Sequence, residues 1–326
     1  MVYIIKSKLL SKGASLFNVN VSDLKLIGGF SNNVFEVNSS KGTFIIKYYP
    51  SSMYERHSIA SELDWITYLS ESGVNVTIPI ASINNKLLEV IILNNEEVCY
   101  VSAFEKAKGE FVDVFNNKEW NASLFYTWGR TLGKIHRLSK SYRPTDPKIK
   151  RKDWDSGLLF TDAILVNNLI KQKWENFIHD LNKLPKDKNG YGMIHHDLHH
   201  KNFYLFKKEL VLFDFGDCEY SWFVYDIAIV LYHALQVVDD REKKDFVYKF
   251  IRPFLKGYQT EHQLQSDWLL KIPFFLNYRQ IYSYIYFSTY LTNEQQKNDR
   301  TKQAIQRLKT KIENDIPVLD FHLSIL

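Results

Sequence analysis

The sequence predicts an α+β protein of two lobes: a five-stranded antiparallel sheet with one helix, followed by a mainly helical C-terminal lobe. Three observations lead to this prediction. From Asp23 the chain alternates β-prone runs with glycine-containing turns. Beyond residue 111, apolar residues recur at helical spacing. With 326 residues, the chain is long enough for about two units of ~100–200 residues, each with its own core.

Composition limits the class of protein. Hydrophobic residues make up 45% and charged residues 24%, as in ordinary globular proteins, so extensive disorder is not expected. The net charge of +5 is small and the basic residues are scattered, which argues against a nucleic-acid partner. Cys99 and Cys218 are too few for a disulfide framework or a zinc-binding spacing, and we expect buried thiols.

The start of the chain and its longest apolar runs indicate the cellular location of the protein. The segment MVYIIKSKLL has too short an apolar core for a signal peptide, and no small-residue cleavage site follows it. No run approaches the ~20 apolar residues of a membrane span. We therefore expect a cytoplasmic protein with no membrane contact. Nothing in the sequence indicates an oligomeric state.

Residues 1–22 are expected to form a short helix or an extended lead-in, and the first strands follow. Gly28 and Gly29 sit in the first turn, where they allow the backbone to adopt positive φ or to approach a ligand closely. Ser31 and Asn32 at the tip could offer donors to phosphate oxygens. An ordinary hairpin turn has the same composition, so both interpretations stay open here.

Lys47 lies near the end of the third expected strand, and Glu62 follows within an expected helix. A strand-end lysine on its own is usually solvated. Residues 58–69 form an amphipathic pattern in which Glu62 falls on the apolar face. A carboxylate there is costly unless it is paired. We therefore expect Glu62 to pair with Lys47.

The remaining strands and the helices complete the expected lobes. Residues 87–93 and 97–104 are predicted as the last two strands of the sheet. The polar segment EKAKGEF at 105–111 is the expected hinge, so the N-terminal lobe is 1–104 and the C-terminal lobe 112–326. The expected helices of the second lobe are 124–138, 162–184, 222–238, 243–258, 269–291 and 295–312.

The central stretch, residues 194–217, reads IHHDLHHKNFYLFKKELVLFDFGD. Two short apolar runs, 202–206 and 209–213, flank the pair Lys207–Lys208, which is the pattern of a tight β-hairpin. HHDLHHKN stands before the hairpin and DFG stands after it.

Such a hairpin would bring Asp197, Asn202 and Asp214 to one end of one small sheet. Two of them could hold magnesium while the third faces a hydroxyl, as phosphoryl transfer requires. Two alternatives stay open. The histidines of HHDLHH could ligate zinc in a metal hydrolase, although their spacing does not match familiar zinc motifs. They could also lie on a solvated loop.

The spacing H-x-D-x-x-x-x-N, followed twelve residues later (214 − 202) by DFG, resembles the catalytic and metal-binding loops of the aminoglycoside/choline-kinase-like phosphotransferases. The resemblance covers about residues 20–300. It is closest to the bacterial branch of stress response kinases and type II homoserine kinases, in which an acidic residue and an aromatic segment follow DFG, as in DFGDCEYSWFVYDIA. The resemblance implies a bilobal protein-kinase-like fold with ATP and Mg²⁺ in the cleft.

The resemblance also implies roles for individual residues. It assigns Asp197 as the catalytic base, Asn202 and Asp214 as metal ligands, and Lys47 with Glu62 as the pair that orients the ATP phosphates.

Two further residues receive supporting roles. His195 is expected to brace the catalytic turn, and Asp226 to stabilise the loop through hydrogen bonds. The sequence departs from the family pattern H-G-D-L-H-P-G-N: His196 replaces glycine, His200 proline and Lys201 glycine. The glycine loop also lacks G-x-G-x-x-G.

The function implied is an ATP- and Mg²⁺-dependent O-phosphotransferase whose acceptor is a small-molecule hydroxyl: an aminoglycoside, an amino alcohol or a homoserine-like compound. Asp217 and Glu219 could meet a cationic acceptor, or simply be solvated. Tyrosines repeat every four residues from Tyr278 to Tyr290, as either a core face or an aromatic pocket, and Arg279 beside them could bind an acceptor anion.

Two alternatives to a small-molecule kinase remain. One is a serine/threonine protein kinase of the stress response type, against which stands the lack of an A-P-E segment after Asp214. The other is a non-catalytic nucleotide-binding module, which typically loses one of the key residues. None of those residues is lost in this chain.

Overall fold

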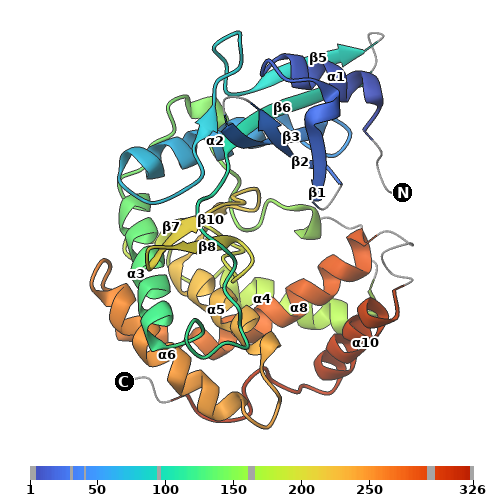
Figure 1. Cartoon of the computed structure of the whole chain (residues 1–326). Coiled ribbons are helices and arrows are strands. Elements are labelled where there is room, and N and C mark those ends of the chain that lie inside the picture. Colours follow the sequence, from blue (N-terminus) through green and yellow to red (C-terminus); the bar gives the residue numbers. More distant parts are fainter. Residues whose placement is uncertain are drawn as a thin grey trace. The chain divides into compact units, whose positions relative to one another are not determined.

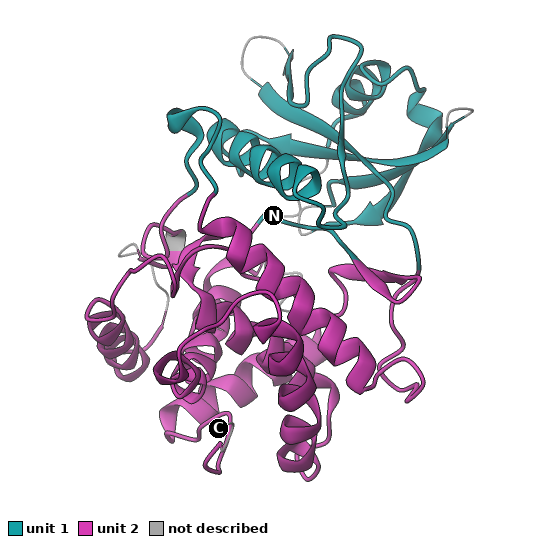
Figure 2. Cartoon of the chain, turned by 90° about the vertical axis from the view of Figure 1, so that its left-hand side faces the viewer, with its two compact units in different colours: residues 1–109, 142–151, 211–216 teal, residues 110–141, 152–210, 217–326 magenta. Residues whose placement is uncertain are grey.

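A computed structural model describes residues 5–29, 32–39, 42–93, 97–160, 166–291 and 298–323. The chain forms two compact units, coloured separately in Figure 2. Unit 1 comprises residues 1–109, 142–151 and 211–216; unit 2 comprises 110–141, 152–210 and 217–326. Each unit is therefore built from segments that are distant in the sequence. The expected lobe boundaries and the hinge at 105–111 stay predictions.

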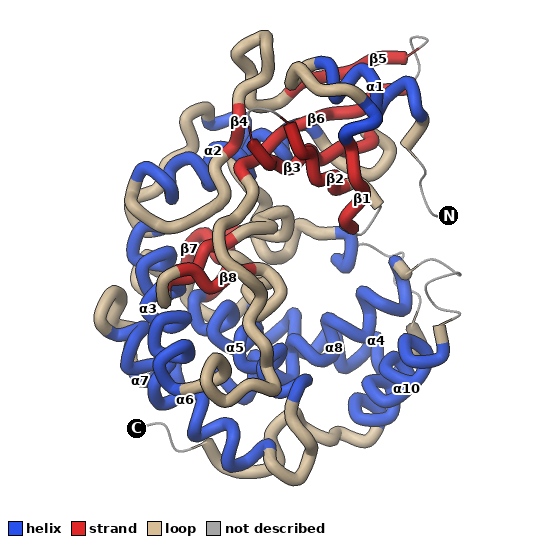
Figure 3. The backbone as a smooth tube through the Cα atoms, viewed as in Figure 1, coloured by secondary structure: helices blue, strands red, loops and turns tan. Residues whose placement is uncertain are grey.

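Unit 1 contains an antiparallel sheet with strand order β1-β2-β3-β6-β4, in which β5 also pairs with β6 (Figure 1; β4 is labelled in Figure 3). The sheet has six strands rather than the expected five, because the two-residue β4 pairs with Ala103 and Phe104. Its elements are α1 (Ser7–Ser15), β1 (Leu24–Gly28), β2 (Val34–Ser39), β3 (Gly42–Pro50), α2 (Arg56–Glu71), β4 (Pro79–Ile80), β5 (Glu89–Leu93) and β6 (Glu97–Glu105).

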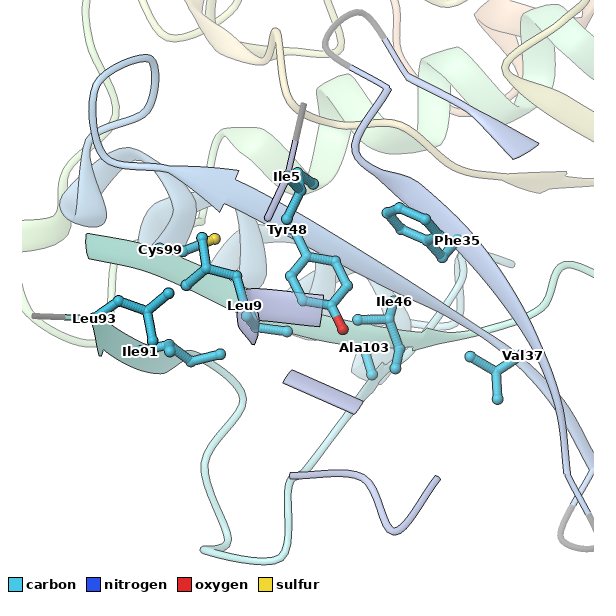
Figure 4. Close-up of a cluster of buried hydrophobic side chains, with 11 residues drawn as sticks. Ile5, Leu9, Phe35, Val37, Ile46, Tyr48, Ile91, Leu93, Cys99 and Ala103 are labelled. Carbon is cyan, nitrogen blue, oxygen red and sulfur yellow. The ribbon is translucent and has the colours of Figure 1, made fainter. Parts of the chain in front are cut away.

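The core of unit 1 follows from the alternation of apolar residues along these strands. Val37, Ile46 and Val101 point to one side and are fully buried. Figure 4 shows this cluster, in which Leu9 of α1 and the Tyr48 ring also lie. The Tyr48 hydroxyl donates to the Leu10 carbonyl at 2.9 Å, so the polar tip of this ring is satisfied on the helix that it packs against.

Unit 2 is mainly helical (Figure 3). Its elements are α3 (Ala122–Ser139), α4 (Asn168–Leu181), β7 (Tyr191–Ile194), β8 (Phe203–Phe206), β9 (Glu209–Leu212), β10 (Glu219–Trp222), α5 (Phe223–Ala234), α6 (Lys243–Gln259), α7 (Ser266–Leu269), α8 (Ile272–Tyr290) and α10 (Asp299–Glu313), with short 3₁₀ turns between some of them.

Helices α3 and α6 approach each other unusually closely because glycines line their contact. A Cβ atom on Gly129 would lie 1.9 Å from the Phe254 carbonyl oxygen, and one on Gly257 would lie 2.0 Å from that of Tyr126. Only glycine leaves room for this backbone-to-backbone contact. Asn121 begins α3 by accepting hydrogen bonds from the backbone of Ser123 and Leu124.

The hairpin predicted from the sequence is present as β8 and β9. Lys207 and Lys208 both have positive φ, 51° and 66°, as a two-residue type I′ turn requires. The boundary between the two units falls within β9. A separate antiparallel pair, β7 with β10, aligns Ile194 with Glu219. Residues 195–202 therefore connect two short strands, β7 and β8.

Two simpler predictions can also be compared with the fold. Cys99 and Cys218 are both fully buried, as expected. Among the residues described, no helix combines the length and the apolar character needed to cross a membrane.

Candidate active site

The loop between β7 and β8, in unit 2, brings Asp197 and Asn202 together. The Asn202 side-chain amide donates to the Asp197 backbone oxygen at 2.8 Å and to Asp197 Oδ2 at 3.2 Å. Backbone hydrogen bonds tighten the same turn, from His199 N to Asp197 O and from Asn202 N to His199 O. His195 is fully buried, and its Nδ1 lies 3.4 Å from the Asp197 backbone nitrogen.

The loop is anchored by Asp226, a fully buried residue in the first turn of α5. Its carboxylate accepts the backbone N–H of His195 at 2.8 Å and that of His196 at 3.0 Å. His136 of α3 lies between this carboxylate and the Tyr258 hydroxyl, at 3.1 and 2.7 Å. Burial lowers the pKa of His136 although Asp226 opposes the shift. The hydrogen bonds expected from Asp226 to the loop are thus present.

Four side chains surround the Asp197 carboxylate: Asn202 and three that carry basic groups. Arg279 Nη2 lies 3.1 Å and His233 Nε2 3.4 Å from Oδ1, while His199 Nε2 lies 3.3 Å from Oδ2. Burial alone would raise the pKa of Asp197, but hydrogen bonds from both histidines and the charge of Arg279 hold it well below its usual range. Burial also lowers the pKa of His233. Asp197 is therefore held as a carboxylate.

His196 occupies the position at which the family pattern has glycine. Its φ is 69°, in the left-handed region that favours glycine. The ring packs against Tyr225 and Tyr282, and its Nε2 lies 3.4 Å from Glu219 Oε1. Burial, together with the charges of Arg279 and Lys152, holds the pKa of His196 well below its usual value. Burial of the neutral ring offsets part of the backbone strain.

In unit 1, Lys47 of β3 forms an ion pair with Asp214, 3.0 Å from Nζ to Oδ1. Glu62 is buried on α2. A Cβ placed on Gly216 would lie 3.9 Å from both Glu62 Oε2 and Asp214 Oδ1, so the two carboxylates converge on the DFG segment. Burial alone would lower the pKa of Lys47. The negative charges of Asp214 and Glu62 outweigh this effect and raise the pKa.

The DFG segment is held in an unusual conformation. Asp214 has a φ of 66°, and the Phe215 side chain is fully buried. Arg151 donates to the Gly216 carbonyl and, at 2.7 Å, to the Ser58 carbonyl near the start of α2. The sequence assigned no role to Arg151, because a single residue in an irregular segment gives no periodic signal.

The glycine turn after β1 has the backbone expected of it. Gly28 and Gly29 have φ values of 147° and 90°, and a Cβ on Gly29 would lie 2.3 Å from Asn33 Oδ1. Asn32 is also left-handed, with a φ of 51°. Ser31 lies outside the described residues. Contact between this turn and phosphate stays a prediction.

The structure also shows where the other candidate acceptor-binding residues lie. Glu219 is buried beside His196 and Lys152 rather than solvated, whereas Asp217 is exposed. Tyr278 packs in the core against Trp174, with 5.5 Å between ring centroids. The anion that Arg279 binds here is Asp197. Within the described part of the chain, no group of three or more His, Cys, Asp or Glu residues is arranged to hold a metal ion.

Comparisons with known proteins show the family to which the chain belongs. Residues 23–264 match the Phosphotransferase enzyme family. The chain belongs to this family. It is 31% identical over 330 residues to the amicoumacin kinase of Bacillus subtilis (strain 168), a match that covers 98% of this chain and 96% of the relative. The chain is therefore a phosphotransferase, as its sequence predicted.

Solved structures of other proteins are similar to this chain over almost its whole length. Amicoumacin kinase hAmiN, in complex with AMP-PNP, Ca²⁺ and Ami, is 29% identical with a TM-score of 0.89, covering 98% of this chain and 96% of that one. A microcompartment-associated aminopropanol kinase has a TM-score of 0.74 at 17% identity, covering 94% and 95%. The spectinomycin phosphotransferase APH(9)-Ia, also at 17% identity, has a TM-score of 0.59, covering 95% and 97%.

Family membership confirms the predicted kinase-like fold class and the predicted enzyme class. The narrower likeness to stress response kinases and homoserine kinases stays a prediction. Of the three residues expected at one end of the hairpin sheet, Asp197 and Asn202 are in contact within unit 2. Asp214 belongs to unit 1, and its part in a common site is a proposal.

Proposed function

We propose that this protein transfers the γ-phosphoryl group of ATP to a hydroxyl of a small molecule, with Mg²⁺ as the metal, and that this acceptor is an amicoumacin-like antibiotic. The single observation that carries the proposal is the 31% identity to an amicoumacin kinase over nearly the full length of both chains. The similar structure of hAmiN holds an ATP analogue, a divalent cation and Ami, which supports the same three kinds of ligand here.

In unit 1, the proposed ATP-binding residues are those around Lys47. Lys47 is nearly buried, and two carboxylates keep it charged, so that it can neutralise phosphate oxygens without a large reorganisation. Glu62 would orient the lysine. The proposed backbone and side-chain contacts to phosphate come from Gly28, Gly29, Ser31 and Asn32.

Asn202 and Asp214 are the proposed magnesium ligands. The Asn202 nitrogen donates to Asp197, so the amide oxygen would be the atom that binds the metal. The Asp214 side chain is 57% exposed and bears a carboxylate, and carboxylate and amide oxygens are the ligands that Mg²⁺ prefers. The donor set therefore fits this metal, which would neutralise charge on the phosphates when bound.

Asp197 is the proposed catalytic base, with His195 in support. The Asp197 carboxylate accepts the proton of the acceptor hydroxyl and orients its oxygen. That oxygen forms a bond to the γ-phosphorus as the bond between this phosphorus and the β–γ bridging oxygen breaks, releasing ADP. Because the transition state is loose, positioning and charge stabilisation supply most of the rate.

The test is a measurement of ATP consumption with Mg²⁺ and amicoumacin, beside a panel of aminoglycosides, amino alcohols, homoserine and a generic protein substrate. Asp197→Asn should lower kcat by at least ~10²-fold, the scale of general-base and positioning effects. Glu175→Gln, at an exposed carboxylate of α4, is the matched control and should keep wild-type turnover.

The other outcomes each decide between hypotheses. Phosphorylation of the protein substrate alone would favour the protein-kinase alternative. Tight Mg²⁺-ATP binding with no turnover on any acceptor would favour the non-catalytic module. Turnover with an amino alcohol and none with amicoumacin would keep the phosphotransferase and overturn its proposed acceptor.

A further inference from the structure

We propose that Arg279 of α8 and His233 of α5 are positioning residues that fix the Asp197 carboxylate for proton transfer from the acceptor. This inference rests on the proposed function, in which Asp197 is the base. Neither residue belongs to the H-x-D-x-x-x-x-N motif, and both come from helices that follow the catalytic loop in the sequence.

The two carboxylate oxygens of Asp197 contact side chains from different parts of the chain. Oδ2 contacts side chains of the catalytic loop itself, His199 at 3.3 Å and Asn202 at 3.2 Å. Oδ1 contacts only the helices among the hydrogen bonds and ion pairs described, Arg279 at 3.1 Å and His233 at 3.4 Å. The loop contacts alone leave Oδ1 unrestrained, and rotation about the terminal bond of an aspartate is soft. The helices therefore supply the second fixed point.

Arg279 is built into the fold rather than placed on the surface. Arg279 is 8% exposed, and its guanidinium lies over the Tyr282 ring, 5.3 Å from the ring centroid. A second nitrogen, Nη1, lies 3.4 Å from the His196 carbonyl oxygen. A buried guanidinium is costly unless a carboxylate compensates it, and Asp197 is that carboxylate. This ion pair is therefore unlike a solvated surface pair, which contributes little.

His233 completes the arrangement from α5. Its Nε2 lies 3.3 Å from Arg279 Nη2 and 3.4 Å from Asp197 Oδ1. As a neutral imidazole, Nε2 either accepts from the guanidinium or donates to the carboxylate. In the first tautomer it orients Arg279, and in the second it holds Oδ1 directly. Both tautomers restrain the same oxygen.

This restraint does not block the reaction. A carboxylate offers about four lone-pair sites, and when His233 accepts from Arg279 only Asn202, His199 and Arg279 donate to Asp197, which leaves one site for the acceptor hydroxyl. Loss of the restraint should therefore affect the rate of the chemical step. ATP binding, which is proposed to depend on Lys47, should be little changed.

The first experiment measures kcat and the KM for ATP of Arg279→Ala, with whichever acceptor the wild type uses. We expect kcat to fall ~10–100-fold, while the KM for ATP changes less than about threefold. Added methylguanidine should raise the kcat of Arg279→Ala at least fivefold, because it supplies the missing planar donor. Arg279→Lys should be intermediate, since it keeps the charge and loses the fork.

Three further variants keep the test decisive. His233→Gln retains a donor and an acceptor at the same position and should lower kcat less than His233→Ala does. Arg137→Ala removes an exposed arginine of α3 that pairs with Glu261, and should leave kcat and the methylguanidine response at wild-type values.

The outcomes separate this inference from the function on which it rests. A wild type without acceptor-dependent turnover would mean that the proposed function fails. Wild-type turnover that Asp197→Asn abolishes while Arg279→Ala keeps kcat within twofold would overturn the positioning role alone. A loss that neither methylguanidine nor Arg279→Lys restores, with a lowered Tm, would also overturn it by showing a structural role. If Arg279→Ala does not fold, the two His233 variants decide: equal kcat values in both would overturn the inference.

Discussion

His136 on α3 and Asp226 on α5 share a fully buried contact, with 3.1 Å between Nε2 of the histidine and Oδ2 of the carboxylate. The same carboxylate receives the backbone N–H groups of His195 and His196. Two helices thus fix the backbone from which Asp197 projects. A charge buried at this depth is stable only because donors surround it.

Asp226→Asn should weaken this anchor strongly. An amide places an NH₂ donor where a carboxylate oxygen accepted a backbone N–H, so one donor loses its partner. We expect the free energy of unfolding to fall by about 2–4 kcal/mol and kcat to fall at least ~10-fold. Denaturant unfolding and initial rates would measure both. Asp245→Asn, an exposed aspartate in the first turn of α6, is the control and should change neither.

Lys47→Met should weaken nucleotide binding while keeping most of the side-chain volume. The Lys47 side chain is largely buried, and Asp214 and Glu62 raise its pKa, so that it stays charged. We expect the Kd for Mg²⁺-ATP to rise at least ~10-fold, which corresponds to about 1.4 kcal/mol. Titration calorimetry would measure it. Lys25→Met, at an exposed lysine on β1, should bind as the wild type does. Equal affinities for the two variants would contradict the role of Lys47.

Asp214→Asn should change the response to magnesium. Replacing a carboxylate by an amide removes the charge that binds a hard cation. We expect the Mg²⁺ concentration for half-maximal activity to rise at least ~10-fold, and chelation by EDTA to abolish turnover in the wild type. Asp217→Asn, three residues along and exposed, is the control. Unchanged magnesium dependence in Asp214→Asn would exclude it as a ligand.

Gly129→Ala should destabilise unit 2 because helices α3 and α6 have no space for a methyl group. The new Cβ would lie 1.9 Å from the Phe254 carbonyl oxygen, which is backbone and cannot swing aside. Overpacking of this kind costs at least about 2–3 kcal/mol, so Tm should fall by several degrees. Gly157→Ala, whose nearest neighbour is the flexible end of Lys152 at 3.3 Å, should stay close to the wild-type Tm.

Stability should fall in mild acid through buried histidines such as His262. Burial lowers its pKa to about 4, with the nearby His136 and Lys140 acting in the same direction, and its Nε2 lies 2.9 Å from the Asn189 carbonyl oxygen. In the unfolded chain the pKa is about 6.5. Between these values the unfolded state binds the proton first, so the free energy of unfolding decreases as pH falls below about 6.5.

From pH 7 to pH 5, the loss due to His262 should be about 1–2 kcal/mol. Denaturant midpoints at the two pH values, measured for the wild type and His262→Gln, would test it. The glutamine can still donate to Asn189 but does not titrate, so the variant should lose less stability over this interval. Identical losses in the two proteins would show that His262 is not among the groups responsible.

Local patterns in the sequence were enough to predict the β8–β9 hairpin. The turn at Lys207–Lys208 depends on neighbouring residues alone, and the structure has it with both φ values positive. The anchoring by Asp226 was also predictable, because the family pattern marks that position. The sixth strand was missed because two residues, Pro79 and Ile80, carry no alternation.

Contacts between distant residues could not be predicted in the same way. Arg279 lies 82 residues beyond Asp197, and helical spacing shows which face it occupies but not which carboxylate it meets. Lys47 was expected to pair with Glu62, and the structure gives it an ion pair with Asp214, 167 residues away, in addition to the charge of Glu62. Arg151 gave no signal, because two of the hydrogen bonds that it donates go to backbone carbonyls, which no sequence pattern marks.

The segmented composition of unit 1 has a consequence for synthesis on the ribosome. Residues 1–109 contain its whole sheet, yet Arg151 and Asp214 arrive only with the segments 142–151 and 211–216. The start of α2 has no Arg151 until 151 residues have been translated, and Lys47 has no Asp214 to pair with until 214 of the 326 have been translated. The N-terminal unit, although first to be made, must therefore complete its folding after much of unit 2 has left the ribosome.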